Sequence, residues 1–269
     1  MSIPKKYFRA FQMGLQSAME YRADFFLSIL SGGFIILIQC FLWTAVFAST
    51  QNPVVYGYTL PQMISYSIMA GLVAKMTSTG FEWEIAEDIK NGGLNKFIVQ
   101  PIGYFYYRIC CFLGRKVLQL GILMIISLFA LVLCKIYLGF DLQLKRVLIF
   151  LPFVVLAMVL NFLIYYCISS LAFVMTEVWG VFIAAGQGVL MLSGGIFPLD
   201  IFGEGILKVL SLLPFKYLVF FPANIINGRF YPDEILYGAI NQILWIVIML
   251  FVSNACWRSG MKKYVAVGG

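Results

Sequence analysis

Six long apolar runs, joined by shorter polar segments, dominate this sequence of 269 residues. They cover residues 25–48, 63–79, 117–134, 147–174, 178–197 and 235–257. A helix needs about 20 apolar residues to cross the roughly 30 Å apolar layer of a bilayer, and most of these runs are near that length. They lack the polar alternation that is typical of membrane barrel strands. The sequence therefore predicts an all-α polytopic membrane protein with six transmembrane helices.

The composition leaves little room for a soluble domain. Charged residues make up 12% of the chain and hydrophobic residues 62%, whereas about a quarter of a typical soluble domain is charged. We therefore expect one transmembrane domain over residues 1–269. The net charge of +7 does not indicate nucleic-acid binding, because the basic residues flank the apolar runs. Membrane lipids with anionic headgroups are the expected partners of these residues.

The basic residues also predict the orientation of the chain. Thirteen Lys and Arg residues lie before the first run, between the second and third runs, and after the last run, when Lys75 at the end of the second run is included. Only six lie in the segments that alternate with these. Because cytoplasmic segments carry the excess of Lys and Arg, both termini are expected to be cytoplasmic.

The first residues form an amphipathic pattern. On a helical wheel, residues 3–22 gather their basic and polar side chains on one arc, opposite an apolar arc of Tyr7, Phe8, Phe11, Leu15, Ala18 and Met19. This pattern predicts an interfacial helix within residues 1–24, lying on the inner leaflet. It could be a simple anchor or an elbow that transmits force to the first span.

No pattern of catalytic residues is present in the sequence. The six cysteines lack metal-ligand spacing, histidine is absent, and no G-x-x-x-x-G-K-[ST] motif occurs. The apolar runs also contain no paired ionisable side chains, as ion-coupled carriers require near the midplane. We therefore expect no enzyme activity, no metal and no cofactor on this chain. Any energy for transport must come from a partner, which would bind ATP and Mg.

One short acidic segment, EWEIAEDIKNGGLNKFIVQPI, interrupts this apolar chain. Thr79 and Glu82 have the spacing of a capping box, and further acids load the first turns of a helix. Phe81, Ile85 and Ile89 form a narrow apolar stripe, and Asn91-Gly92-Gly93 provides a stop. Residues 80–102 are therefore expected to hold a short cytoplasmic helix with an acidic outer face, although a solvated loop is the alternative.

A second interruption covers residues 198–231. Prolines and glycines divide it into apolar pieces of about ten residues, which are too short to cross a bilayer. They predict a re-entrant hairpin on the outer side, before a last helix that begins at Pro232 with Asp233 and Glu234 in its first turn.

Four stretches resemble the signatures of the ABC transporter type 2 permease family. EDIKNGGLNKFIVQPI resembles D-I-x-x-G-x-L-x-x-x-L-x-x-P-I, and LSGGIFPLDIF resembles S-G-x-x-x-P-L. PFKYLVFFPANIINGR resembles the P-F-x-Y stretch that follows in the family. WRSGMKKYVAVGG resembles the W-x-x-G-x-x-x-Y-x-x-x-G tail of a branch often encoded as paired permeases beside one ATPase.

The resemblance implies a permease subunit of an ABC exporter in the bacterial inner (plasma) membrane. It would act with two cytoplasmic ABC ATPase subunits and a second permease, either the same chain or a sibling. By position, the coupling helix that contacts the ATPase would contain Glu84, Ile85, Glu87, Asp88, Ile89, Gly92, Leu94 and Pro101. Within it, we expect Ile85 and Ile89 to anchor the ATPase and Asp88 to orient it. The extracellular gate would contain Gly194, Gly195, Pro198 and Leu199.

The translocation route is indicated only by isolated polar residues. Ser65, Ser67, Asn161 and Gln187 lie within the runs and could line a pathway or make hydrogen bonds between helices. With many aromatic residues and only Lys75 as a fixed charge in the runs, near the end of the second, a hydrophobic or amphipathic cargo such as a peptide, antibiotic or lipid-like molecule is expected. Two alternatives remain open: a secondary transporter or channel, and a membrane assembly or immunity protein that does not transport.

Overall fold

The chain is almost entirely helical in the computed structural model, which describes residues 3–50, 52–100 and 102–264. The longer helices are α2 (Arg22–Thr50), α3 (Leu60–Thr77), α6 (Tyr104–Leu138), α7 (Leu144–Ser169) and α11 (Pro232–Met261). The other α-helices are α1 (Ile3–Glu20), α4 (Phe81–Lys90), α5 (Asn95–Val99), α8 (Trp179–Leu192), α9 (Gly203–Ser211) and α10 (Phe220–Ile226). Three 3₁₀ turns, η1 (Ser170–Phe173), η2 (Leu199–Phe202) and η3 (Phe215–Tyr217), join them.

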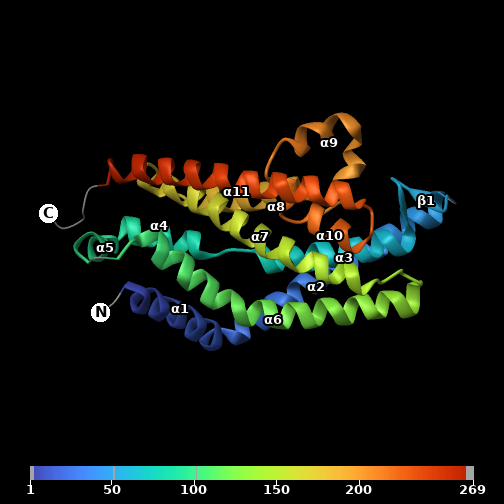
Figure 1. Ribbon diagram of the computed structural model, residues 1–269, viewed down its shortest axis with the longest axis horizontal. Coiled ribbons are helices and arrows are strands. Elements are labelled where there is room, and N and C mark those ends of the chain that lie inside the picture. Colours follow the sequence, from blue (N-terminus) through green and yellow to red (C-terminus); the bar gives the residue numbers. More distant parts are fainter. Residues whose placement is uncertain (1–2, 51, 101, 265–269) are drawn as a thin grey trace.

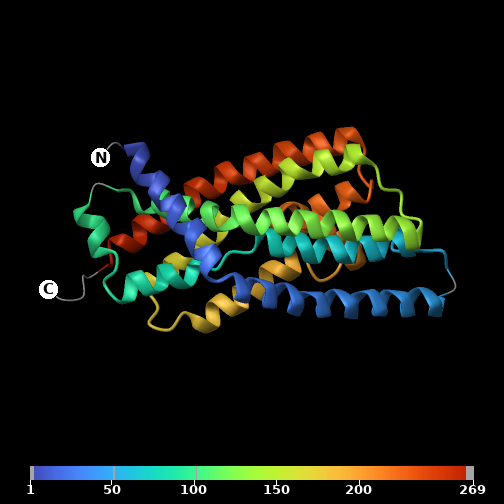
Figure 2. The same cartoon turned by 90° about the horizontal axis from the view of Figure 1, so that it is seen from below.

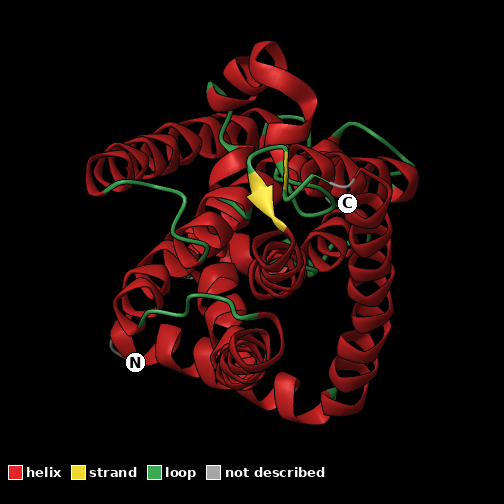
Figure 3. Ribbon diagram, turned by 90° about the vertical axis from the view of Figure 1, so that its right-hand side faces the viewer, coloured by secondary structure: helices red, strands yellow, loops and turns green. Residues whose placement is uncertain are grey.

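The helices form an elongated bundle with two different ends (Figure 1). Both described chain ends, α4 and α5 lie at one end. The other end carries an antiparallel hairpin of β1 (Val54–Val55) and β2 (Tyr58–Thr59). Figure 3 views the bundle from this hairpin end. The first and last described residues therefore lie at the same end of the bundle, and the cytoplasmic location of this end stays a prediction.

Four of the six expected spans are helices that are long and apolar enough to cross a membrane. They are α2, α6, α7 with η1, and α11. The helix α3 has 18 residues but carries Gln62, Ser65, Ser67 and Lys75, and most of its side chains are buried in the bundle. The helix α8 has 14 residues, or about 21 Å at 1.5 Å per residue, which is short of a full crossing. The all-α polytopic class is confirmed, whereas the number of six spans stays a prediction.

The chain between α8 and α11 is broken into short helices. It leaves the bundle after α8, passes through η2 and α9, and returns in α10. The pieces Leu199–Ser211 and Phe215–Ile226 meet at 105°, and α9 stands out from the bundle in Figure 1. The backbone N–H of Phe220 donates to the carbonyl of Ser193 at 2.8 Å. Thus α10 begins where α8 ends, and the helices of the expected hairpin lie between residues 198 and 231.

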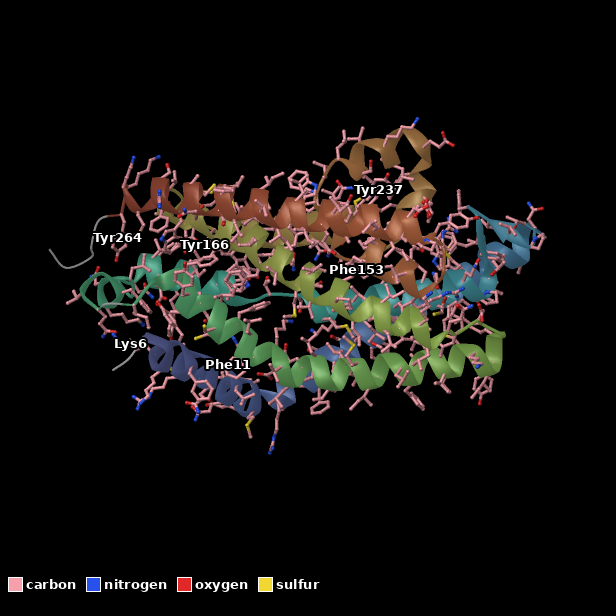
Figure 4. The ribbon with its side chains drawn as sticks, viewed as in Figure 1. Lys6, Phe11, Phe153, Tyr166, Tyr237 and Tyr264 are labelled. Carbon is pink, nitrogen blue, oxygen red and sulfur yellow. The ribbon has the colours of Figure 1, made fainter. Side chains whose placement is uncertain are left out.

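The amphipathic first helix is held directly against α6. A Cβ atom at Gly14 would lie 2.1 Å from the carbonyl oxygen of Cys111, and one at Gly114 would lie 2.1 Å from that of Phe11. Figure 2 shows α1 crossing the bundle at this point, and Figure 4 shows Phe11 on α1. Because only glycine permits this approach, the two helices touch through their backbones.

The apolar arc of α1 is therefore divided between two environments. Phe11 and Leu15 are partly buried, whereas Phe8 and Met19 remain more than half exposed. The structure contains the expected helix, and its exposed apolar side chains are available for a lipid surface.

The contact between α1 and α6 predicts the effect of a single methyl group. In Gly114→Ala, the added Cβ must displace α1, which costs about 1–3 kcal/mol by overpacking. Trypsin should then cleave after Lys5, Lys6 and Arg9 about tenfold faster in detergent, because cleavage follows the population of the open form. Gly121→Ala is the matched control on the same helix, since no atom would lie within 4 Å of its added Cβ. Equal cleavage of the two variants would contradict the backbone contact.

Candidate functional site

The acidic segment forms a helix whose first turn differs from the expected one. Its N-cap is Gly80, with φ 143°, and the helix α4 begins at Phe81. A carboxylate oxygen of Glu82 accepts a hydrogen bond from the backbone N–H of Gly80 at 2.8 Å. The predicted Thr79 capping box is wrong, because the backbone turns at Gly80 and so moves the N-cap one residue along.

The apolar stripe of α4 faces the interior of the chain. Ile85 is 0% exposed, and Phe81 and Ile89 are also buried. The ring of Phe81 lies 4.6 Å from that of Phe162 on α7. In this structure the apolar surface of Ile85 and Ile89 is buried within the chain, against α7 and η1. Their expected role as anchors of an ATPase stays a prediction.

Two of the acids on α4 also bind within the chain. Arg108 of α6 forms ion pairs with Glu84 and Asp88, and Arg115 forms a second ion pair with Glu84. The Arg108 side chain is 7% exposed, and its Nε donates to the hydroxyl of Tyr104 at 2.9 Å. That hydroxyl donates in turn to Asp88 at 2.8 Å. We call these five residues the inner ion network.

The inner ion network fixes the position of α4. Removing one partner from a buried ion pair leaves a charge without compensation, which costs several kcal/mol. The carboxylate of Asp88 binds Arg108 and Tyr104 within this chain, and its expected role in orienting an ATPase stays a prediction. No sequence pattern indicates the network, because α6 begins at Tyr104 and not near Val117, where the apolar run starts.

A different face of α4 is exposed. It consists of Trp83, Glu87 and Lys90, and we call it the outer face of α4; Trp83 is 39% exposed. Of the expected contact residues, only Glu87 has an exposed side chain on this face. The carbonyl of Thr176 accepts a hydrogen bond from the Lys90 ammonium.

The stop after α4 is built as the sequence predicts. Gly92 has φ 74°, a conformation that glycine adopts without strain. A Cβ at Gly93 would lie 2.4 Å from the Asp88 carboxylate, and Leu94 is buried. The hydroxyl of Tyr264 donates to Asn95 of α5 at 2.9 Å, and Figure 4 shows this tyrosine beside the segment. Pro101, also expected in the coupling segment, lies outside the described residues.

The expected gate residues lie in one turn at the end of α8. Gly194 has φ 80°, and its carbonyl accepts a hydrogen bond from the buried hydroxyl of Tyr66 at 2.7 Å. The N–H of Gly195 donates to Leu190 at 2.9 Å and closes the helix. Pro198 and Leu199 are buried directly after this turn. The structure therefore packs these four residues against α3, α8 and the start of α10.

The sequence did not predict a cluster that joins β2 to the segment between α8 and α11. The hydroxyl of Tyr58 donates to Asp200 at 2.7 Å, and Arg229 lies over the Tyr58 ring at 3.7 Å. Arg229 also approaches Asp200 at 3.4 Å. Burial raises the pKa of the Tyr58 phenol, so its hydroxyl stays protonated and continues to donate. The sequence signal for this cluster is a pair of opposite charges, Asp200 and Arg229, within a largely apolar hairpin.

The four polar residues expected along a pathway fall into two pairs. Ser65 donates to Asn227 at 2.6 Å, and Ser67 donates to Met63 in its own helix at 3.0 Å. Both serines are buried and serve packing in this conformation. Asn161 and Gln187 line one cavity of about 290 Å³ that α3, α4, α7 and α8 surround. The structure therefore brings only the second pair together at a cavity.

Metal binding has no support within the part of the chain that the structure describes, where no group of three His, Cys, Asp or Glu side chains could hold an ion.

The sequence profile of a family described as ABC-2 family transporter protein matches residues 34–268. The match includes α4, the turn after α8 and the last helix. Comparison with curated proteins gave no match, and comparison with solved structures gave none.

The turn after α8 can be tested with a matched pair of glycine substitutions. Gly194 and Gly139 both have positive φ angles, 80° and 66°, and each follows the end of a helix, so alanine strains the backbone at both positions. A Cβ at Gly194 would also lie 2.7 Å from the Tyr66 hydroxyl, whereas no atom lies within 4 Å of one at Gly139. Gly194→Ala should therefore lower the free energy of unfolding by about 1–3 kcal/mol more than Gly139→Ala. Thermal unfolding in detergent measures the difference, and equal midpoints would contradict the tight packing of the turn at Gly194.

Proposed function

The chain belongs to the ABC-2 family of transporter proteins, and we propose that it is the membrane-spanning permease subunit of an ATP-driven exporter. ATP and Mg would bind to separate cytoplasmic ATPase subunits. The observation that carries this proposal is α4, a short helix at the end of the bundle that holds both termini. It is fixed to α6 by ion pairs and still exposes one face.

The proposed contact with the ATPase is the outer face of α4, at Trp83, Glu87 and Lys90. Tryptophan is frequent among residues that supply most of the binding energy at protein interfaces. Exposed charges such as Glu87 set orientation and association rate. A force on this face would reach α6 through Arg108, which links α4 to the longest described helix.

The proposed complex contains two permeases and two ATPase subunits in a bacterial inner membrane, with both termini cytoplasmic. The second permease is this chain or a sibling. Support comes from α2, which lies along one edge of the bundle in Figure 2. It exposes a large apolar surface that includes Phe34, Ile38 and Phe41. Such a surface must be covered by lipid or by another helix.

The cargo is proposed to be hydrophobic or amphipathic, and to leave past the turn at Gly194. A secondary transporter or channel would work without an ATPase, and an assembly or immunity protein would not move a cargo. The exposed face of α4 supports the ATP-driven function over both alternatives, because neither of them needs a docking helix. The experiments that follow separate these functions.

Charge reversal tests the proposed docking face. The tagged chain is purified in detergent from its source cells, and the ATP hydrolysis that accompanies it is measured. Glu87→Arg, combined with Trp83→Ala, should reduce this hydrolysis at least tenfold, because removal of an aromatic anchor typically costs about 2 kcal/mol or more, which corresponds to about thirtyfold in affinity. Glu204→Arg is the control, an exposed acid on α9. Undiminished hydrolysis in the double variant would place the contact elsewhere. If the preparation of the parent chain showed no ATP hydrolysis, the ATP-driven function would be contradicted.

Cysteine labelling tests the orientation. Single cysteines at Asn52 and Asp141 should react with an impermeant maleimide on intact cells, because both positions are exposed at the end remote from α4. Cysteines at Asn91 and Lys262 should react only after the membrane is opened. The parent chain corrects for its six own cysteines. Labelling of Asn91 from outside would reverse the orientation and exclude α4 as a cytoplasmic contact.

A further inference from the structure

The cavity that contains Asn161 and Gln187 has further polar walls. Its volume is about 290 Å³. Besides these two residues, its polar lining consists of Thr77, Ser78, Thr79, Glu82, Tyr165 and Ser193. Leu190, Leu218 and Val219 supply apolar walls. The cavity therefore lies between the end of α3 that precedes α4 and the turn at Gly194, and one acidic residue enters it.

Asn161 leaves an acceptor without a donor. Its Nδ2 donates to the carbonyl of Thr77 at 2.8 Å. Its Oδ1 has no hydrogen-bond partner among the described residues, although the side chain is only 4% exposed. A buried acceptor without a donor destabilises the folded chain, because it has lost its hydrogen bond to water. A ligand that donates a hydrogen bond here would remove this cost.

Glu82 is the second unusual group, a carboxylate that is 7% exposed. It accepts a hydrogen bond from Gly80, but none of the ion pairs among the described residues includes it, whereas Glu84 on the same helix has two arginines. Burial raises the pKa of the Glu82 carboxyl, and hydrogen bonds from Thr79, Gly80 and its own backbone oppose this shift.

Lys116 is a buried cation whose charge interacts with that of Glu82, but no ion pair among the described residues joins the two side chains. Lys116 donates instead to the hydroxyl of Ser78 at 3.3 Å and to the carbonyl of Lys75 at 3.4 Å, at the end of α3. These contacts favour a cation at the C-terminal end of a helix. Glu82 is the acidic residue in the cavity lining.

We propose that this cavity binds a protonated amino group of the cargo. Glu82 supplies the compensating charge, and the free oxygen of Asn161 accepts a hydrogen bond from the same ammonium. The volume lies at the lower limit of ligand pockets, which measure about 300–1,000 Å³. A cationic head group therefore enters, while an apolar tail stays outside. The proposal rests on the exporter function and narrows its cargo to amphipathic amines.

Glu82 also stabilises the first turn of α4 through its hydrogen bond with Gly80. The experiment must separate this structural role from the proposed binding of an ammonium group. Glu82→Gln retains an oxygen that can accept from Gly80 while it removes the charge. Glu204→Gln makes the same change at an exposed glutamate on α9, to which no role is assigned, and is the matched control. A pair of probes gives a comparison that needs no variant: dansylcadaverine, a fluorescent amine with an apolar ring system, and its N-acetyl derivative, which carries no charge.

The binding experiment uses the full chain without ATPase in phosphatidylcholine nanodiscs. Dansyl fluorescence is titrated for both probes. We expect the parent chain to bind the amine at least tenfold more tightly than the acetylated probe. Glu82→Gln should remove this preference, and Glu204→Gln should retain it. Asn161→Leu should weaken binding of the amine and leave the acetylated probe unchanged.

Equal affinity of the parent chain for the two probes would overturn the proposal, as would an unchanged preference in Glu82→Gln. These results are independent of the exporter function, because no ATPase is present in the titration. A chain that retains its ATPase but shows no preference for the amine would be an exporter with a different cargo. If the chain preferred the amine but did not associate with an ATPase, the proposed binding site would stand and the proposed ATP-driven function would be contradicted.

Discussion

The irregular backbone between α8 and α11 must satisfy its own hydrogen bonds, and much of the structure follows from this constraint. In an apolar bundle, no water is at hand for a free carbonyl or amide. The carbonyl of Ser193 therefore binds the N–H of Phe220, that of Gly194 binds the Tyr66 hydroxyl, and that of Ile196 accepts from Gln39 at 2.9 Å. These bonds connect the broken segment to α2, α3 and α10. A helix interrupted at depth is stable only because its neighbours supply these donors.

The buried charge at the α4 end of the bundle must also find its partners within the chain. Arg108 is buried, and a guanidinium in such a site needs partners for its rigid donors. Glu84 and Asp88 supply them from α4, and the Tyr104 hydroxyl completes the set. The ring of Tyr104 is stacked on Trp257 of α11 at 5.0 Å. Tyr166, labelled in Figure 4, contacts the same tryptophan. The position of α4 is therefore determined by two long helices at once.

The sequence is informative where the pattern is local. Apolar runs predict α2, α6, α7 and α11, and the stop at Gly92 predicts the end of α4, because helix length and backbone conformation depend on neighbouring residues. The sequence is misleading where contacts between distant segments determine which surface covers a residue. The stripe of Ile85 and Ile89 indicates one buried face of α4, but a sequence does not say whether the covering surface is the chain itself or a partner. Likewise, Tyr58 and Asp200 are far apart in the sequence, and no periodic pattern relates them.

The helix α3 runs from the β1–β2 hairpin toward α4. Its 18 residues extend about 27 Å, and most of its side chains are buried. Tyr66 binds the carbonyl of Gly194, and at the last residue of α3 the carbonyl of Thr77 binds Asn161. After three residues, the last of which is Gly80, the chain enters α4. Because close-packed interiors transmit strain, a displacement of α4 by an ATPase would reach both the cavity and the turn at Gly194. Under the proposed function, α3 is therefore the element that would relate ATPase contact to cargo release.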